Sequence, residues 1–146
     1  MISFYADRVL HKQGFVPTSF SGTTAVDTAA IDRLGFNTAF ILIDNAAASG
    51  TPTAVTFTLT FSDGATSSPA TAVTLSAAPA AYSVLAAGCA MYTVDLSNFN
   101  RYFKATVTPA FTEGTEPAVV ASCALVLADS RVDPASGTAV IPLKKA

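Results

Sequence analysis

The side chains in this sequence that could do nucleophilic, acid–base or metal chemistry are few and widely spaced. His11 is the single histidine, and Cys89 and Cys123 are the only thiols. A serine or cysteine nucleophile needs a histidine held beside it. His11 falls in an irregular segment, where a solvent-facing or capping role is far more common than a catalytic one. The three side chains also lack the short ligand spacing of a zinc site. We therefore expect no enzyme, no bound metal and no cofactor.

The acidic residues fall in or beside turn-like segments. A pair of carboxylates can hydrolyse a glycosidic bond, but Asp beside Gly, Ser or Pro more often caps a turn. The isolated glycines form no phosphate-binding loop. We interpret the acids as turn residues: Asp63, Asp95, Asp129, Asp133, Glu113 and Glu116.

The composition indicates one domain whose surface is poor in charge. The chain has 146 residues, of which 51% are hydrophobic and 12% are charged, about half the usual charged fraction of roughly 25%. A surface with so little charge is typical of one that other protein covers. The net charge of −2 argues against nucleic acid as a partner, because phosphate binding needs clustered Lys and Arg.

No membrane span or secretory signal is predicted. The longest apolar run, residues 118–128, is interrupted by Ser122 and is shorter than the roughly 20 residues that cross a bilayer. Asp7, Arg8 and Lys12 occupy the region where a signal peptide has its apolar core. We expect a soluble chain made in a cytoplasm.

In a cytoplasmic product the two cysteines favour free thiols. Cys123 lies within an apolar run and reads as a small buried side chain. A single bond between Cys89 and Cys123 is the alternative.

The elements that would position any site are strands. Apolar residues alternate with Thr and Ser from residue 55 to 62, and a second alternation runs from 102 to 108. This period of two is expected when one face of a strand is buried. The predicted core residues are Val55, Phe57, Leu59, Phe61, Phe103, Ala105 and Val107.

Two segments are apolar without alternation. Residues 39–43 and 118–128 are predicted to be interior strands covered on both faces. Residues 24–34 could form a turn or two of helix, although their Thr and Val favour extended backbone. With no other helix expected, the pattern predicts an all-β fold, an antiparallel β-sandwich of jelly-roll type.

The chain divides into three predicted parts. Residues 1–20 form either an N-terminal docking arm or an edge strand, residues 21–128 form the β-sandwich domain, and residues 129–146 form an irregular tail. Both ends carry apolar residues with no clear place in a sandwich core. The candidate contact residues are Phe4, Tyr5, Arg8, Phe15, Ile141 and Leu143.

Two stretches resemble small head decoration (cement) proteins of tailed bacteriophages. The first is Ser21-Gly22-Thr23-Thr24-Ala25-Val26-Asp27-Thr28 with Gly35-Phe36 and the apolar run to Ile43. The second is Val94-Asp95-Leu96 with the strand that starts at Arg101-Tyr102 and the apolar run from Val119 to Leu127. Together they span roughly residues 21–128. The resemblance does not extend to the Ala-rich residues 77–90 or to residues 129–146.

The resemblance implies a jelly-roll-like protein on the outside of a capsid, made in the host cytoplasm, that bridges major capsid subunits and forms a dimer or trimer. Its partner would be the major capsid protein. A phage tail or baseplate protein is an alternative. A carbohydrate-binding β-sandwich is another, with Tyr82, Tyr92 and Tyr102 as its stacking surface.

Overall fold

The computed structural model describes residues 9–128 and 143–145, and the fold is given for these residues. They contain strands and no helix. The strands are β1 (Val9–Ser21), β2 (Val26–Asp27), β3 (Ile31–Asp32), β4 (Thr38–Asn45), β5 (Ala54–Gly64), β6 (Thr71–Ala72), β7 (Tyr82–Ser83), β8 (Gly88–Asp95), β9 (Tyr102–Thr112), β10 (Ala118–Ala128) and β11 (Leu143–Lys144).

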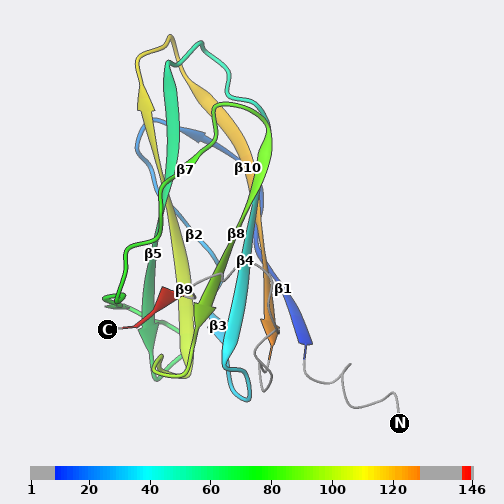
Figure 1. The fold of residues 1–146 in the computed structure, drawn as a ribbon, viewed down its shortest axis with the longest axis vertical. Coiled ribbons are helices and arrows are strands. Elements are labelled where there is room, and N and C mark those ends of the chain that lie inside the picture. The colour runs from blue at the N-terminus through cyan, green and yellow to red at the C-terminus, as the bar shows by residue number, and fades with distance from the viewer. Residues whose placement is uncertain (1–8, 129–142, 146) are drawn as a thin grey trace.

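The strands form two sheets that pack into a sandwich (Figure 1). Sheet A has the order β1-β10-β4-β8-β11. Sheet B has the order β2-β9-β5-β6, with β3 also paired to β9 and β7 to β5. The pairings are antiparallel except that of β11 with β8. The chain crosses between the sheets at most connections, which is the jelly-roll topology. The predicted all-β sandwich is confirmed.

The alternating segments form the centre of sheet B. In β5 and β9, Leu59 lies opposite Val107 and Phe61 opposite Ala105. The apolar residues of both strands are buried, with Phe57 1% exposed and Phe103 0%, while the Thr and Ser between them face outward. Period-two alternation therefore predicted the buried face of this sheet correctly.

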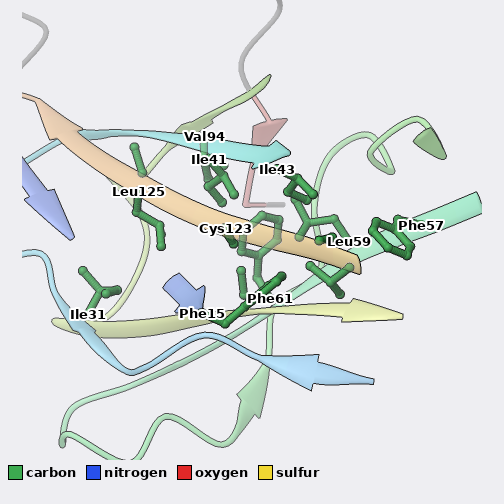
Figure 2. Packing of buried hydrophobic residues seen from close by; sticks show 14 of the residues in the cluster. Phe15, Ile31, Ile41, Ile43, Phe57, Leu59, Phe61, Val94, Cys123 and Leu125 are labelled. Carbon is green, nitrogen blue, oxygen red and sulfur yellow. The ribbon is translucent and has the colours of Figure 1, made fainter. Parts of the chain in front are cut away.

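The core lies between the two sheets, and Figure 2 shows its side chains converging from both. Phe15 and Phe20 of β1 contact each other with ring centroids 5.7 Å apart, and Phe20 lies 4.9 Å from Phe57. Phe99, from the connection between β8 and β9, packs edge-on between Phe61 and Phe103, at 6.1 and 6.0 Å. The segment that carries the chain from one sheet to the other thus contributes a core residue.

The expectation that the two apolar runs are covered on both faces was wrong. Strand β4 is central, between β10 and β8, and Ile41 and Leu125 are fully buried. On the outer face, however, Phe40 is only partly buried and Val120 is 45% exposed. A strand in a two-layer sandwich has only one inner face, so the apolar residues on the other face lie at the surface.

The segment 24–34 is extended and contains β2 and β3 in place of a helical turn. Val26 pairs with Val107 and Ile31 with Phe103, so both short strands lie at the edge of sheet B. Ile31 is buried in the core. Packing and the low helix propensity of Thr and Val favour this conformation.

Candidate functional site

The outer surface of sheet A carries a contiguous group of apolar side chains, here called the apolar face. In β10 and β4, Val126 lies opposite Phe40 and Ala124 opposite Leu42. Leu42 in turn lies opposite Met91 of β8. Met91 is 55% exposed, whereas Phe40 and Leu42 are half-buried by their neighbours in the sheet. The apolar face consists of Phe40, Leu42, Met91, Ala124 and Val126, whereas Val120 lies farther along β10, beyond the row of Ser122, Asp44 and Cys89.

Polar residues border the apolar face. His11 of β1 pairs with Val126 at one side of the sheet, and Asp44 lies between Ser122 and Cys89 toward one end of the strands. An apolar centre with a polar rim is the usual composition of a protein–protein interface. A face with no charge at its centre can be buried against another protein at little desolvation cost.

The outer surface of sheet B has a different composition and is here called the threonine face. Thr58 lies opposite Thr108, and Thr60 lies opposite Thr106. Together with Thr56 these residues form a regular array of hydroxyls on β5 and β9. At the β2 edge, Asp27 accepts hydrogen bonds from Thr106 at 2.6 Å and Lys104 at 2.5 Å. These bonds lower the pKa of Asp27, with the Lys104 bond the larger cause. A surface of hydroxyls and charged groups forms hydrogen bonds readily with water.

An open groove of about 580 Å³ lies between the start of β1 and the β3 edge of sheet B. Its lining combines apolar residues with a lysine and an acid: Leu10, Lys12, Gln13, Ala29, Ala30, Ile31, Asp32, Leu34, Phe36 and Tyr102. The groove therefore borders the β1 edge of sheet A.

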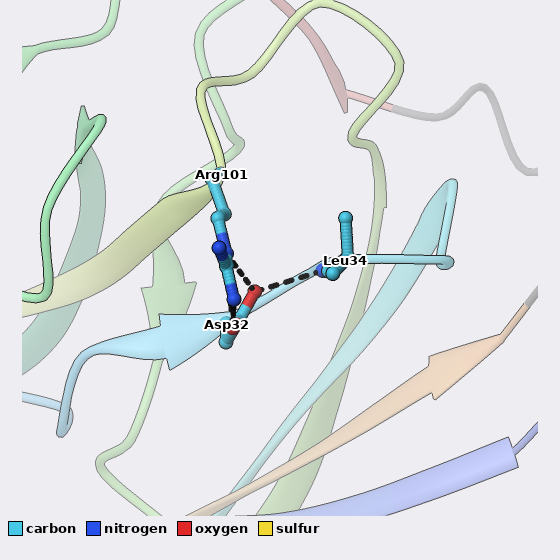
Figure 3. A network of polar contacts seen from close by, with 3 residues as sticks. All are labelled: Asp32, Leu34 and Arg101. Carbon is cyan, nitrogen blue, oxygen red and sulfur yellow. Dashed lines mark hydrogen bonds and ion pairs between the residues drawn. The ribbon is translucent and has the colours of Figure 1, made fainter.

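One wall of the groove is fixed by the ion pair between Asp32 and Arg101 (Figure 3). Arg101 Nη2 donates to Asp32 Oδ2 at 2.7 Å, and the backbone N–H of Leu34 donates to Oδ1 at 3.0 Å. The Arg101 hydrogen bonds, followed by that from Leu34, lower the pKa of Asp32. The Asp32 carboxylate is therefore engaged in fixing a turn and is a poor general base.

The side chains that could act as nucleophiles or metal ligands are unreactive or lie apart from one another. Cys89 is exposed and Cys123 buried, and both thiols are free, as predicted. Burial raises the pKa of Cys123 to about 12. The hydrogen bond with Asp44, together with burial, raises the pKa of Cys89. Both thiols are therefore protonated at neutral pH and weak nucleophiles. Within residues 9–128 and 143–145, no three His, Cys, Asp or Glu side chains gather as a metal site would require.

Two of the tyrosines considered for sugar stacking serve the fold. Tyr82 donates its hydroxyl to Asn45 Oδ1 at 2.9 Å, and Tyr92 donates to the carbonyl of Ala80 at 3.0 Å. Both rings pack against the core. Burial raises the pKa of each hydroxyl. The Arg101 guanidinium lies over the Tyr102 ring, with Cζ 5.2 Å from the ring centroid.

The predicted contact residues are dispersed. Phe4, Tyr5, Arg8 and Ile141 lie outside the described residues. Leu143 is in β11 and pairs with Val94. Phe15 is 8% exposed and its ring is part of the core, so its burial stabilises the sandwich.

Sequence reasoning missed the apolar face itself. Its signal was present, because residues 39–43 and 118–128 are apolar at both odd and even positions. Such a run is compatible with a strand buried on both faces and with a strand that exposes apolar residues to a partner. Periodicity alone does not separate these cases.

Several solved structures are similar to this chain. A chain in the structure of infectious bursal disease virus Gt strain superposes with a TM-score of 0.52 at 11% identity, covering 87% of this chain and 33% of that one. A chain of the Gx strain gives 0.52 at 14% identity, covering 82% and 31%. The PBSX exported protein XepA gives 0.46 at 17% identity, covering 90% and 42%.

The chain therefore spans less than half the length of each of these proteins. At such identities the likeness to the two viral chains defines the fold, a jelly-roll sandwich. No family model and no curated protein matches the sequence. The part of the chain that the structure describes contains no helix with the length and hydrophobicity of a membrane span.

Proposed function

We propose that this chain is a viral structural protein that binds the outside of a bacteriophage capsid and stabilises it by bridging major capsid subunits. The observation that carries the proposal is the apolar face, where Met91 is 55% exposed beside Leu42 on the outer surface of sheet A. Monomers rarely expose contiguous apolar side chains in this way, and such patches mark interaction sites. The chain acts as a binding protein and not as an enzyme.

Two further observations support a viral partner. The sequence resembles head decoration proteins over roughly residues 21–128, and chains of a virus structure have the same fold. In this role the protein needs no catalytic group. A protein that binds the assembled shell and not the free subunits stabilises the shell by mass action. Contacts with several subunits at once multiply weak affinities.

The sheet A side of the sandwich is the side that faces the shell in this proposal. Strand β1 is its edge, and the candidate contact residues Phe4, Tyr5 and Arg8 precede β1 directly. They would extend the contact beyond the sheet. The threonine face, which is rich in hydroxyls and carries the Asp27–Lys104 pair, would face the solvent on the virion exterior. A dimer or trimer of the chain would present several apolar faces together.

Counting the protein in purified particles tests the proposal. Heads and tails are separated, and the chain is quantified against the major capsid protein by mass spectrometry. We expect a copy number comparable to the capsid protein in the head fraction. A low count confined to the tail fraction would favour a tail or baseplate protein. Absence from particles, together with binding in a glycan screen, would favour a carbohydrate-binding module.

A further inference from the structure

Residues 143–145 form a short segment, here called the closing segment, that joins the edges of the two sheets. In β11, Leu143 and Lys144 pair in parallel with Val94 and Asp95 of β8, at the edge of sheet A. The next residue, Lys145, forms an antiparallel bridge with Leu75, which follows β6 of sheet B. The closing segment, red in Figure 1, therefore lies between β8 of sheet A and Leu75 beside sheet B, and the place that it fills is here called the slot.

A buried acid lies at the end of this slot. Asp63 of β5 is 0% exposed, and its Oδ2 accepts hydrogen bonds from Lys145 Nζ at 2.7 Å and from the backbone N–H of Asn100 at 2.9 Å. The ammonium also lies 6.0 Å from the centroid of Phe99. Burial raises the pKa of Asp63, but the hydrogen bonds from Lys145 and Asn100 outweigh it, so that the pKa lies below its ordinary value.

The slot favours a segment that carries a cation. Asp63 Oδ1 has no hydrogen-bond partner among the described residues, so the carboxylate depends on the donors that Lys145 and Asn100 supply. Without Lys145 the buried carboxylate would keep only the donors of Asn100 and would lose its cation, which is an expensive arrangement. A strand end therefore fills the slot best if it brings a cation to the position of Lys145.

The link that precedes the closing segment is much longer than the distance it must cover. Leu127, Ala39, Val94 and Leu143 lie in one row across sheet A, so β10 and β11 are three strand spacings apart, about 14 Å. Residues 129–142 lie between these strands. Those fourteen residues can extend to about 46 Å. This length permits the closing segment to reach a neighbouring molecule as well as its own slot.

We propose that the slot is a strand-acceptor site which, in the assembled protein, takes the closing segment of a second copy of this chain. The exchanged segment makes the same contacts in the neighbour as in its own molecule: pairing with Val94 and Asp95, and the ion pair with Asp63. Exchange of an identical element costs little for this reason and is a common route to oligomers. The preference for a cation gives the exchange specificity. This inference is independent of capsid binding, because it concerns contacts between copies of the chain.

Cysteine trapping with full-length chains tests the proposal. Asp95→Cys is placed in one copy and Lys144→Cys in another, both with Cys89→Ser, and the two chains are co-expressed with different affinity tags. After oxidation we expect a disulfide-linked heterodimer that survives non-reducing electrophoresis. The matched control replaces Asp95→Cys with Thr58→Cys on the threonine face and should give at least tenfold less heterodimer. Two results together would overturn the proposal. The first is a heterodimer no more abundant than in this control, and the second is a disulfide formed within a single chain of the Asp95→Cys/Lys144→Cys double variant.

A second measurement avoids cysteine variants, in case they fold poorly. Native mass spectrometry of the unmodified chain over rising concentration should show an oligomer, and removal of residues 143–146, which leaves no segment to exchange, should reduce its fraction at least tenfold. Lys12→Gln, which removes an exposed lysine of β1, should leave the fraction unchanged. A chain that stays monomeric throughout, or an oligomer that persists without residues 143–146, contradicts the exchange.

Discussion

The two outer faces of this sandwich are built from strands of equal regularity but of opposite surface character. On sheet B, every outward position of β5 and β9 from Thr56 to Thr60 and from Thr106 to Thr108 is a threonine. On sheet A, the corresponding positions of β4 and β10 include Phe40, Leu42 and Val126. The core needs neither set, because it is filled from the inner faces. The apolar face is therefore not needed to fill the core, and its exposure supports the docking surface proposed above.

The largest expected effect on the free energy of unfolding comes from removing core side chains. Comparing such variants in the two sheets tests whether both contribute equally to the core. Phe57→Ala in sheet B and Leu125→Ala in sheet A each remove a fully buried side chain and should each lower the free energy of unfolding by about 3–5 kcal/mol. Urea denaturation measures both. Phe103→Ala should behave like Phe57→Ala. A near-neutral result in one sheet would mean that its inner face is misassigned and that the comparison of outer faces fails.

The second effect concerns the buried ion pair that joins the sheets. Lys145→Met leaves the Asp63 carboxylate without its cation and should cost about 2 kcal/mol of stability at pH 7. Lys12→Met is the control and should change stability by less than about 0.5 kcal/mol. Equal effects of the two variants would show that the ion pair contributes nothing specific to stability.

The same pair predicts a dependence on pH. The pKa of Asp63 is lower in the folded state than its ordinary value, which is about 3.9 in an unfolded chain. The stabilisation is therefore fully present above that value and is lost as the pH falls through the lower folded pKa. Unfolding midpoints measured from pH 6 to pH 2 should fall less steeply for Asp63→Asn than for the unmodified chain. Parallel curves would contradict the lowered pKa.

The smallest effect lies on the threonine face. The Lys104–Asp27 pair is partly exposed, at 28% and 46% of its side chains, and solvent screens exposed pairs. Lys104→Ala should change the free energy of unfolding by at most about 1 kcal/mol, and the loss should shrink further in 1 M salt. Thermal unfolding at two salt concentrations measures this. A larger, salt-independent loss would show that this edge is part of the packed core.

The inner faces of the fold were predictable from sequence because a strand with one buried face alternates apolar and polar residues. Phe57, Phe61 and Phe103 follow that rule. The outer apolar face was not predictable, because burial by a second sheet and burial by another protein place the same residues in a strand. The role of Phe15 was also missed, since the irregular pattern of β1 reflects two shifts in its register with β10, between Gln13 and Phe15 and between Phe15 and Thr18. Such shifts move a side chain to the other face of the strand.

The Asp63–Lys145 pair was beyond sequence reasoning for another reason. The two residues are 82 positions apart, and Asp63 precedes a glycine as a turn residue would. Its burial depends on the closing segment and on the connection that carries Asn100, neither of which has a local pattern. Tertiary contacts of this kind leave no periodic signal.

The measurement that tests the central claim most directly is capsid binding by a matched pair of surface variants. Met91→Asp places a charge at the apolar face, and Thr58→Asp places the same charge at the threonine face; both positions are exposed. Both proteins should remain folded, with unfolding midpoints close to that of the unmodified chain. In titrations against purified capsids that lack the protein, we expect Met91→Asp to weaken binding at least tenfold and Thr58→Asp to leave it unchanged. Equal binding by the two variants, or loss only with Thr58→Asp, would contradict the assignment of the apolar face as the docking surface.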